Sequence, residues 1–138
     1  GLDRMFLAVF SNSLQEEALE NGTSRTVLKL PAILAPYKAA ILPLVKKDGL
    51  PEVARKIMDD LKWDFNVFYD EKDAVGKRYR RQDAAGTPFC ITVDHQTLED
   101  KSVTIRHRDT MEQKRVKITE LKELIHAEVA VKNWLQRM

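Results

Sequence analysis

The sequence predicts an α/β domain built on a mixed sheet of about five strands with helices packed on it. Two observations predict this class. An apolar run, an amphipathic helix pattern and a second apolar run follow one another between residues 37 and 70. Three short strand patterns then follow between residues 89 and 118. The first order is typical of a parallel crossover unit and the second of hairpin-like returns.

The first strand is expected over residues 37–45, and Pro43 should mark its end or a sheet edge because proline lacks a ladder donor. A helix follows with proline in its first turn and apolar residues at a spacing of four: Val53, Ile57, Leu61 and Phe65. Residues 66–70 then form a short strand. The later elements are expected in this order: a helix over residues 74–85 that ends at Gly86, a strand over 89–93, a turn over 95–102, strands over 103–108 and 114–118, and a last helix from Thr119.

The beginning of the chain predicts a different kind of segment. Residues 1–20 are expected to form a helix, because Gly1-Leu2-Asp3-Arg4 leads directly into an apolar run with no preceding structure. We therefore expect the chain to be a fragment of a longer protein. Residues 21–36 contain two prolines and are predicted to be a linker, which leaves residues 37–138 as the domain.

Composition excludes some classes of protein. Of the 138 residues, 43% are apolar and 32% charged, which is typical of soluble globular proteins, and no apolar run is long enough to cross a bilayer. The net charge of +2 does not by itself predict a polyanionic partner. A single cysteine, Cys90, cannot form an internal disulfide, so we expect a reducing, cytosolic setting.

Four cations gather within five residues of the helix predicted over residues 74–85. Since each helical residue advances about 100°, the helix has an apolar side and a basic side, with Arg78 flanking: Val75 and Tyr79 against Lys77, Arg80 and Arg81. One interpretation is a solvated surface helix. The other is a surface that binds something negative, because like charges at this spacing repel unless an anion offsets them and only Asp83 is near in sequence.

A second basic group supports the binding interpretation. Arg106 and Arg108 alternate on one face of a predicted strand, and the following turn, Asp109–Gln113, adds acceptors, donors and a thioether. If the sheet brings this group near the basic helix, the surface would suit phosphates and splayed bases.

Catalytic chemistry is poorly represented. The sequence has no glycine-rich phosphate loop, no His-Glu-x-x-His and no Cys-x-x-Cys, and its three histidines are widely separated. Cys90 lies in a predicted core strand, where a buried thiol is inert. A small α/β enzyme or a signalling receiver would need an acidic or nucleophilic cluster at the strand ends, and none is evident.

Three motifs together resemble a known family: Lys77–Asp83, Gly86–Cys90 and Arg106–Gln113. They closely resemble the C-terminal anticodon-binding domain of the dimeric, bacterial-type glycyl-tRNA synthetase, a class II aminoacyl-tRNA synthetase, from about Thr26 to Leu124. The sequence departs from the usual family pattern at His107, where an acidic residue is common, and at Ala84-Ala85, where Glu-Ile is common.

The resemblance implies a fold and an activity. The family's fold is a five-stranded mixed sheet surrounded by three helices, preceded here by a remnant helix of the catalytic core. Gly1-Leu2-Asp3-Arg4 resembles motif 3 of that core, whose arginine, here Arg4, holds the ATP phosphates. The intact enzyme would be a homodimer acting on glycine, ATP with magnesium, and glycine tRNA. Motifs 1 and 2 do not occur in this chain, so we do not expect it to aminoacylate tRNA by itself.

The resulting hypothesis assigns separate roles to the basic groups. Lys77, Arg78 and Arg81 would hold phosphates of the tRNA. Base reading would fall to the strand and turn residues, namely Arg106, Arg108, Asp109 and Gln113. The alternative is a non-catalytic accessory module that uses the same fold for protein or DNA contacts.

Overall fold

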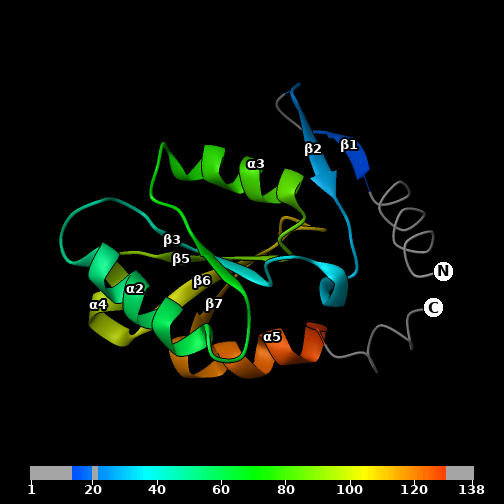
Figure 1. Ribbon diagram of the computed structural model, residues 1–138. Coiled ribbons are helices and arrows are strands. Elements are labelled where there is room, and N and C mark those ends of the chain that lie inside the picture. Colours follow the sequence, from blue (N-terminus) through cyan, green and yellow to red (C-terminus); the bar gives the residue numbers. More distant parts are fainter. Residues whose placement is uncertain (1–13, 20–21, 130–138) are drawn as a thin grey trace.

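The computed structural model describes residues 14–19 and 22–129, which form a five-stranded sheet with helices on both faces and a separate two-stranded sheet (Figure 1). The large sheet and its helices comprise β3 (Ala39–Pro43), α2 (Leu50–Leu61), β4 (Val67–Tyr69), α3 (Val75–Ala85), β5 (Phe89–Val93), α4 (His95–Asp100), β6 (Ser102–His107), β7 (Gln113–Lys117) and α5 (Leu121–Val129). Single 3-10 turns, Ala32–Leu34 and Ile118–Glu120, complete it.

The large sheet has the strand order β4-β3-β5-β6-β7. β3 pairs in parallel with both β4 and β5, so α2 and α3 are the helices of two crossover connections. β5, β6 and β7 pair antiparallel and follow one another as neighbours. The predicted mixed five-stranded sheet is therefore confirmed, and each observed strand boundary lies close to the predicted one.

One face of the sheet carries the main core. α2 and α5 pack there through a shared set of buried apolar residues, which includes Leu50, Ile57 and Ile125 together with Ile91 and Ile105 of the sheet. Burying one such side chain fully contributes about 1.5–3 kcal/mol. β3 is buried along its whole length and ends at Pro43, as predicted. None of the helices in the described ranges is long and apolar enough to span a bilayer.

α3 lies on the opposite face, where the apolar contact is small. Ala40, Leu42 and Cys90 form it, with Tyr79 of the helix packed against them. The helix ends at Gly86, whose φ of 83° is left-handed, and a Cβ there would lie 3.0 Å from the side chain of Leu28. Glycine is thus required both by the backbone conformation and by the close approach of β2.

The two-stranded sheet corrects the prediction for the start of the chain. Residues 14–18, expected to be helical, form β1 (Leu14–Ala18), which pairs antiparallel with β2 (Ser24–Leu28) in the predicted linker. The helix was favoured by local residue types, but pairing and the burial of Arg25 and Val27 against the domain decide the conformation. Residues 1–13, which carry the rest of that prediction, lie outside the described residues, and the division of the chain at residues 20 and 36 stays a prediction.

A second correction concerns the segment after β5. The residues predicted as a turn over 95–102 begin with the short helix α4. Asp94 accepts a hydrogen bond from the Thr97 amide while the Thr97 hydroxyl accepts one from the Asp94 amide. This reciprocal cap stabilises the first turn of a helix whose length gave no periodic signal.

Candidate nucleic-acid interface

The cations of α3 divide between surface and interior. Lys77, Arg80 and Arg81 are exposed, whereas Arg78 is only 2% exposed. Arg78 donates hydrogen bonds to the backbone carbonyls of Pro43, Leu44 and Asp70, and so ties the helix to the ends of β3 and β4. Burial lowers the pKa of its guanidinium, an effect that the charge of Asp70 opposes. The phosphate contact predicted for Arg78 therefore has no exposed guanidinium to make it.

Arg81 is half-exposed and already paired. Its guanidinium lies 2.8 Å from the carboxylate of Asp70 and 2.7 Å from that of Asp73. The hydrogen bond from Arg81 lowers the pKa of Asp73. The side chain of Lys77 is exposed and makes no hydrogen bond or salt bridge with the described part of the chain. Of the three residues predicted to hold phosphates, Lys77 is the one with the most accessible charge.

The side chain of Arg106 reaches α3, where it meets the carboxylate of Asp83. Its two terminal nitrogens donate to Asp83, with Nη1–Oδ1 and Nη2–Oδ2 distances of 2.8 and 3.1 Å. The guanidinium carbon lies 4.7 Å from the ring centroid of Tyr79, a cation–π distance. Both Asp83 and Arg106 are buried, at 0% and 3% exposure. The basic helix and the basic strand therefore meet in the interior rather than as an open cationic patch.

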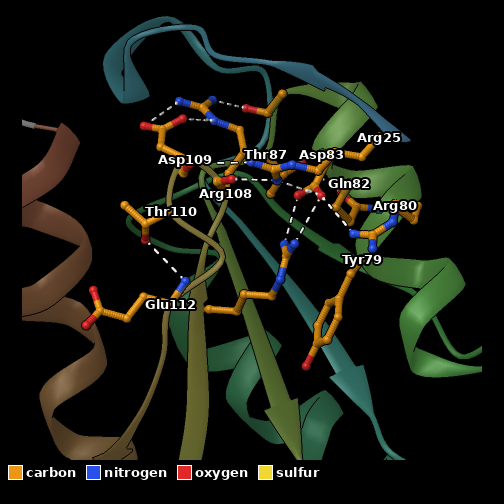
Figure 2. A network of polar contacts seen from close by, with 12 residues as sticks. Arg25, Tyr79, Arg80, Gln82, Asp83, Thr87, Arg108, Asp109, Thr110 and Glu112 are labelled. Atoms are coloured by element: carbon orange, nitrogen blue, oxygen red, sulfur yellow. Dashed lines mark hydrogen bonds and ion pairs between the residues drawn. The ribbon is translucent and has the colours of Figure 1, made fainter. Parts of the chain in front are cut away.

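Arg25 of β2 joins the same cluster, a residue that the sequence did not single out. It donates to Asp83 Oδ2 at 2.9 Å and to the carbonyl of Arg108 at 2.7 Å. Figure 2 shows Asp83 between the side chains that reach it from β2 and from α3. On its other side Arg25 donates to Glu17 of β1 at 2.8 Å. No local pattern marks this role, since its partners are distant in the chain.

Arg108 is also buried, at 3% exposure, and it organises the backbone around it. Its guanidinium donates to the carbonyls of Gly86 and Leu30, at 2.8 and 2.6 Å. Its Nε donates to the carboxylate of the next residue, Asp109, at 2.8 Å (Figure 2). The guanidinium of Arg108, which was predicted to contact a base, thus bonds to Gly86, Leu30 and Asp109 in the interior.

The β6–β7 turn comprises residues 108–112. Arg108 is buried, and the side chains that follow it are exposed to solvent. Asp109 is 56% exposed, and Thr110, Met111, Glu112 and the following Gln113 are exposed too. The turn is closed by backbone hydrogen bonds between His107 and Met111 and between His107 and Glu112. Met111 has a φ of 61°, an unusual value for a residue with a side chain. The turn therefore offers acceptors, an amide and a thioether on a defined backbone.

The sheet face next to α3 extends this surface. Arg106 lies opposite Gln113 and Thr104 opposite Arg115 in the β6–β7 register, which places these residues on one face. Lys117 falls on the same face of β7 and is exposed. Arg115 is held by two hydrogen bonds to Asp94, at 2.6 and 2.9 Å, which lower the pKa of that carboxyl. The face is polar, with exposed donors at Gln113 and Lys117.

The cysteine and two of the histidines that were considered as catalytic or metal-binding residues pack against other side chains of the domain. Burial raises the pKa of the Cys90 thiol to about 12, so it is not a nucleophile at neutral pH. His107 packs edge-on against Phe89, and His126 against Phe65. In the described ranges no three His, Cys, Asp or Glu side chains gather to hold a metal ion. The four residues of the predicted ATP motif, Gly1, Leu2, Asp3 and Arg4, lie outside the described residues.

Comparisons with known proteins agree with this arrangement. A family model described as "Anticodon binding domain" matches residues 38–128. The chain is 52% identical over 129 residues to the glycine–tRNA ligase of Borrelia hermsii, covering 94% of this chain and 29% of that protein. It is 59% identical over 125 residues to the glycine–tRNA ligase of Rhodopirellula baltica, covering 88% of this chain and 23% of that protein. The chain thus spans about a quarter of the length of these relatives.

Solved structures share the fold at lower identity. A prolyl-tRNA synthetase from Cryptosporidium parvum superposes with a TM-score of 0.68 at 18% identity, covering 88% of this chain and 32% of that one. The RNA binding domain of threonyl-tRNA synthetase from the same organism gives a TM-score of 0.65 at 24% identity, covering 72% of this chain and 25% of that one. At these identities the likeness concerns the fold.

Proposed function

The chain belongs to the family of anticodon-binding domains, and from this premise we propose that it is the anticodon-recognition domain of a glycine–tRNA ligase. The glycine assignment is supported by the identity of 52% and 59% to relatives of that name over most of the chain. The location of the site is supported by one structural observation. The β6–β7 turn is exposed, Arg25 holds its backbone carbonyls from the interior, and Arg108 holds the carboxylate of Asp109.

The chemistry of this turn fits the bases that it would read. Every glycine codon begins with two guanines, so two anticodon bases of every glycine tRNA are cytosines. A cytosine offers an exocyclic amine, for which a carboxylate is the natural acceptor. Asp109 presents such a carboxylate, with Arg108 holding its orientation, and Gln113 adds an amide that can donate or accept. Each base contact of this kind is worth about 1–3 kcal/mol of discrimination.

The remaining predicted residues receive roles that match their exposure. Lys77 and Arg81 hold phosphates of the anticodon arm from the surface of α3, Arg81 less strongly because Asp70 and Asp73 already share its charge. Arg78, Arg106 and Arg108 act from the interior, by positioning α3 and the β6–β7 turn.

The activity of the longer protein is part of the same proposal. It attaches glycine to glycine tRNA using ATP with magnesium, as a homodimer in the cytoplasm. Gly1-Leu2-Asp3-Arg4 resembles the motif whose arginine binds ATP in that family, and Arg4 would take this role. Residues 1–138 by themselves would bind tRNA without charging it.

A titration with two RNA stem–loops tests the proposal. One carries the anticodon loop of glycine tRNA, and the other has guanines in place of the two cytosines. Fluorescence anisotropy at several salt concentrations should show at least about tenfold tighter binding to the first, from one or more base contacts. Equal affinity for the two loops, as expected of an accessory module for other partners, would overturn the assignment.

Three variants separate phosphate from base contacts. Lys77→Ala should weaken binding to both loops about equally, whereas Lys56→Ala, an exposed lysine on α2 across the sheet, should change neither affinity. Asp109→Asn should reduce the preference and leave the affinity for the guanine loop unchanged, because it replaces an acceptor by an amide. Uniform weakening by Asp109→Asn would contradict its role in base reading.

A further inference from the structure

We propose that Arg25 is a positioning residue for anticodon reading, through which the β1–β2 hairpin holds the β6–β7 turn in its binding geometry. The inference rests on the proposed function of that turn and extends it to a residue outside the matched range of 38–128. Arg25 itself does not touch the RNA, since its side chain is 0% exposed.

The contacts of Arg25 fall into two groups that share the nitrogen Nη2. In the first group Nη1 donates to the carbonyl of Arg108 at 2.7 Å and Nη2 to that of Asp109 at 3.3 Å. In the second group Nε and Nη2 donate to Glu17 of β1, at 3.2 and 2.8 Å. Nη1 also donates to Asp83 of α3 at 2.9 Å. One side chain therefore joins the hairpin, α3 and the β6–β7 turn.

The two carbonyl contacts constrain the part of the turn that carries the exposed acceptor. Arg108 orients the carboxylate of Asp109 through side-chain hydrogen bonds, while Arg25 fixes the backbone of the same two residues. A hydrogen bond that distinguishes one base from another requires the side chain to lie within about 0.5 Å of its ideal position. Without Arg25 the carboxylate of Asp109 would remain paired with Arg108, but the backbone on which both residues stand would lose its anchor to the hairpin.

Lysine cannot reproduce this arrangement. The guanidinium is a planar fork with five donors, and Arg25 uses it to reach two carbonyls and two carboxylates at once. A lysine at position 25 would supply the positive charge that Asp83 and Glu17 require, through a single nitrogen. Arg25→Lys therefore separates the charge of the residue from its hold on the turn.

The test uses three variants of residues 1–138: Arg25→Lys, Arg25→Ala and, as the matched control, Arg55→Lys, the same change at an exposed arginine of α2 across the sheet. The affinity ratio between the cytosine and guanine stem–loops should fall about three- to tenfold in Arg25→Lys, the value of about one lost hydrogen bond, and stay unchanged in Arg55→Lys. Should Arg25→Ala fail to fold, Arg25→Lys decides the outcome.

Hydrogen exchange at the Met111 and His107 amides, which close the turn, provides a readout that needs no RNA. Arg25→Lys should speed exchange there and leave the amides of β3 protected. Unchanged protection with an unchanged affinity ratio would overturn the positioning role, and so would an equal loss in Arg55→Lys, because the effect would then not depend on the contacts of Arg25. A wild-type chain with no preference for the cytosine loop would overturn the proposed function instead, and the exchange measurement would still report on Arg25.

Discussion

Replacing Asp83 by asparagine should destabilise the domain more than any conservative change on its surface. Asp83 is fully buried and receives hydrogen bonds from two guanidinium groups, those of Arg25 and Arg106, which are themselves 0% and 3% exposed. Asparagine has nearly the same shape, but it carries no negative charge and turns one acceptor into a donor. Arg106 would then be buried without its anion, and Arg25 would keep only Glu17.

The size of the effect follows from this burial. Removing one partner of a buried ion pair costs about 3–5 kcal/mol, because the remaining charge stays desolvated. A domain of this size has a total free energy of unfolding of about 5–15 kcal/mol. The melting temperature should therefore fall by roughly 10–20 °C. The matched control is Asp73→Asn, whose side chain is 51% exposed, so that solvent screens its pair with Arg81 and its loss should cost little stability.

Urea unfolding followed by circular dichroism measures both variants. Asp83→Asn should lower the transition midpoint with an unchanged slope, since the surface exposed on unfolding is the same. If Asp83→Asn lost less than about 1 kcal/mol, or no more than Asp73→Asn, the cluster would be dispensable and the account of how it holds α3 to β6 would be refuted.

Other properties of the described residues lead to measurable expectations. Cys90, with its thiol pKa raised to about 12 by burial, should resist alkylation at pH 8 in the native chain and react readily in urea, as mass spectrometry can follow; fast native labelling would contradict its burial. The pKa of Asp94 is lowered by its hydrogen bonds from Arg115, so its contribution to stability is present above the usual carboxyl pKa and is lost as pH falls through the lower folded value. Below about pH 3.8 the wild type should thus lose stability more steeply than Asp94→Asn in urea titrations, and parallel curves would count against the pair. Met111→Gly should raise stability by up to about 1 kcal/mol by removing the strain of a positive φ, and a clear loss would show that the Met111 side chain packs usefully.

Local sequence signals were sufficient for the large sheet. The spacing of apolar residues in α2, the glycine that ends α3 and the proline that ends β3 each act within a few residues of the chain, so the pattern alone predicts them. The alternation along β6 predicted that Arg106 and Arg108 share a face but left open whether that face meets α3, which the bond from Arg106 to Asp83 now shows. These features depend mainly on residues that are close in sequence, so the sequence pattern was enough to predict them.

The hairpin and the burial of the arginines depend on distant partners and were not predictable in this way. Arg25 meets Asp83 58 positions later and the carbonyl of Arg108 83 positions later. At the sequence level, Asp83 is only a nearby anion that could offset part of the charge of α3. That Asp83 neutralises Arg25 and Arg106 can be known only from how the two separate sheets pack against α3. A count of cations in a motif therefore overestimates the charge available at the surface.

The burial of these cations also determines how affinity and specificity divide. Arg78 and Arg106 lie inside, and Arg81 is shared with two carboxylates, so α3 and β6 offer fewer free charges to phosphates than their sequences suggest. Phosphate contacts provide most of the salt-dependent, sequence-independent affinity of such surfaces. A surface with fewer phosphate contacts binds any RNA loop less tightly, and its discrimination depends on contacts with bases. Contacts with bases depend more on a rigid turn than on a high positive charge at the surface. A buried guanidinium that donates to backbone carbonyls makes the turn rigid.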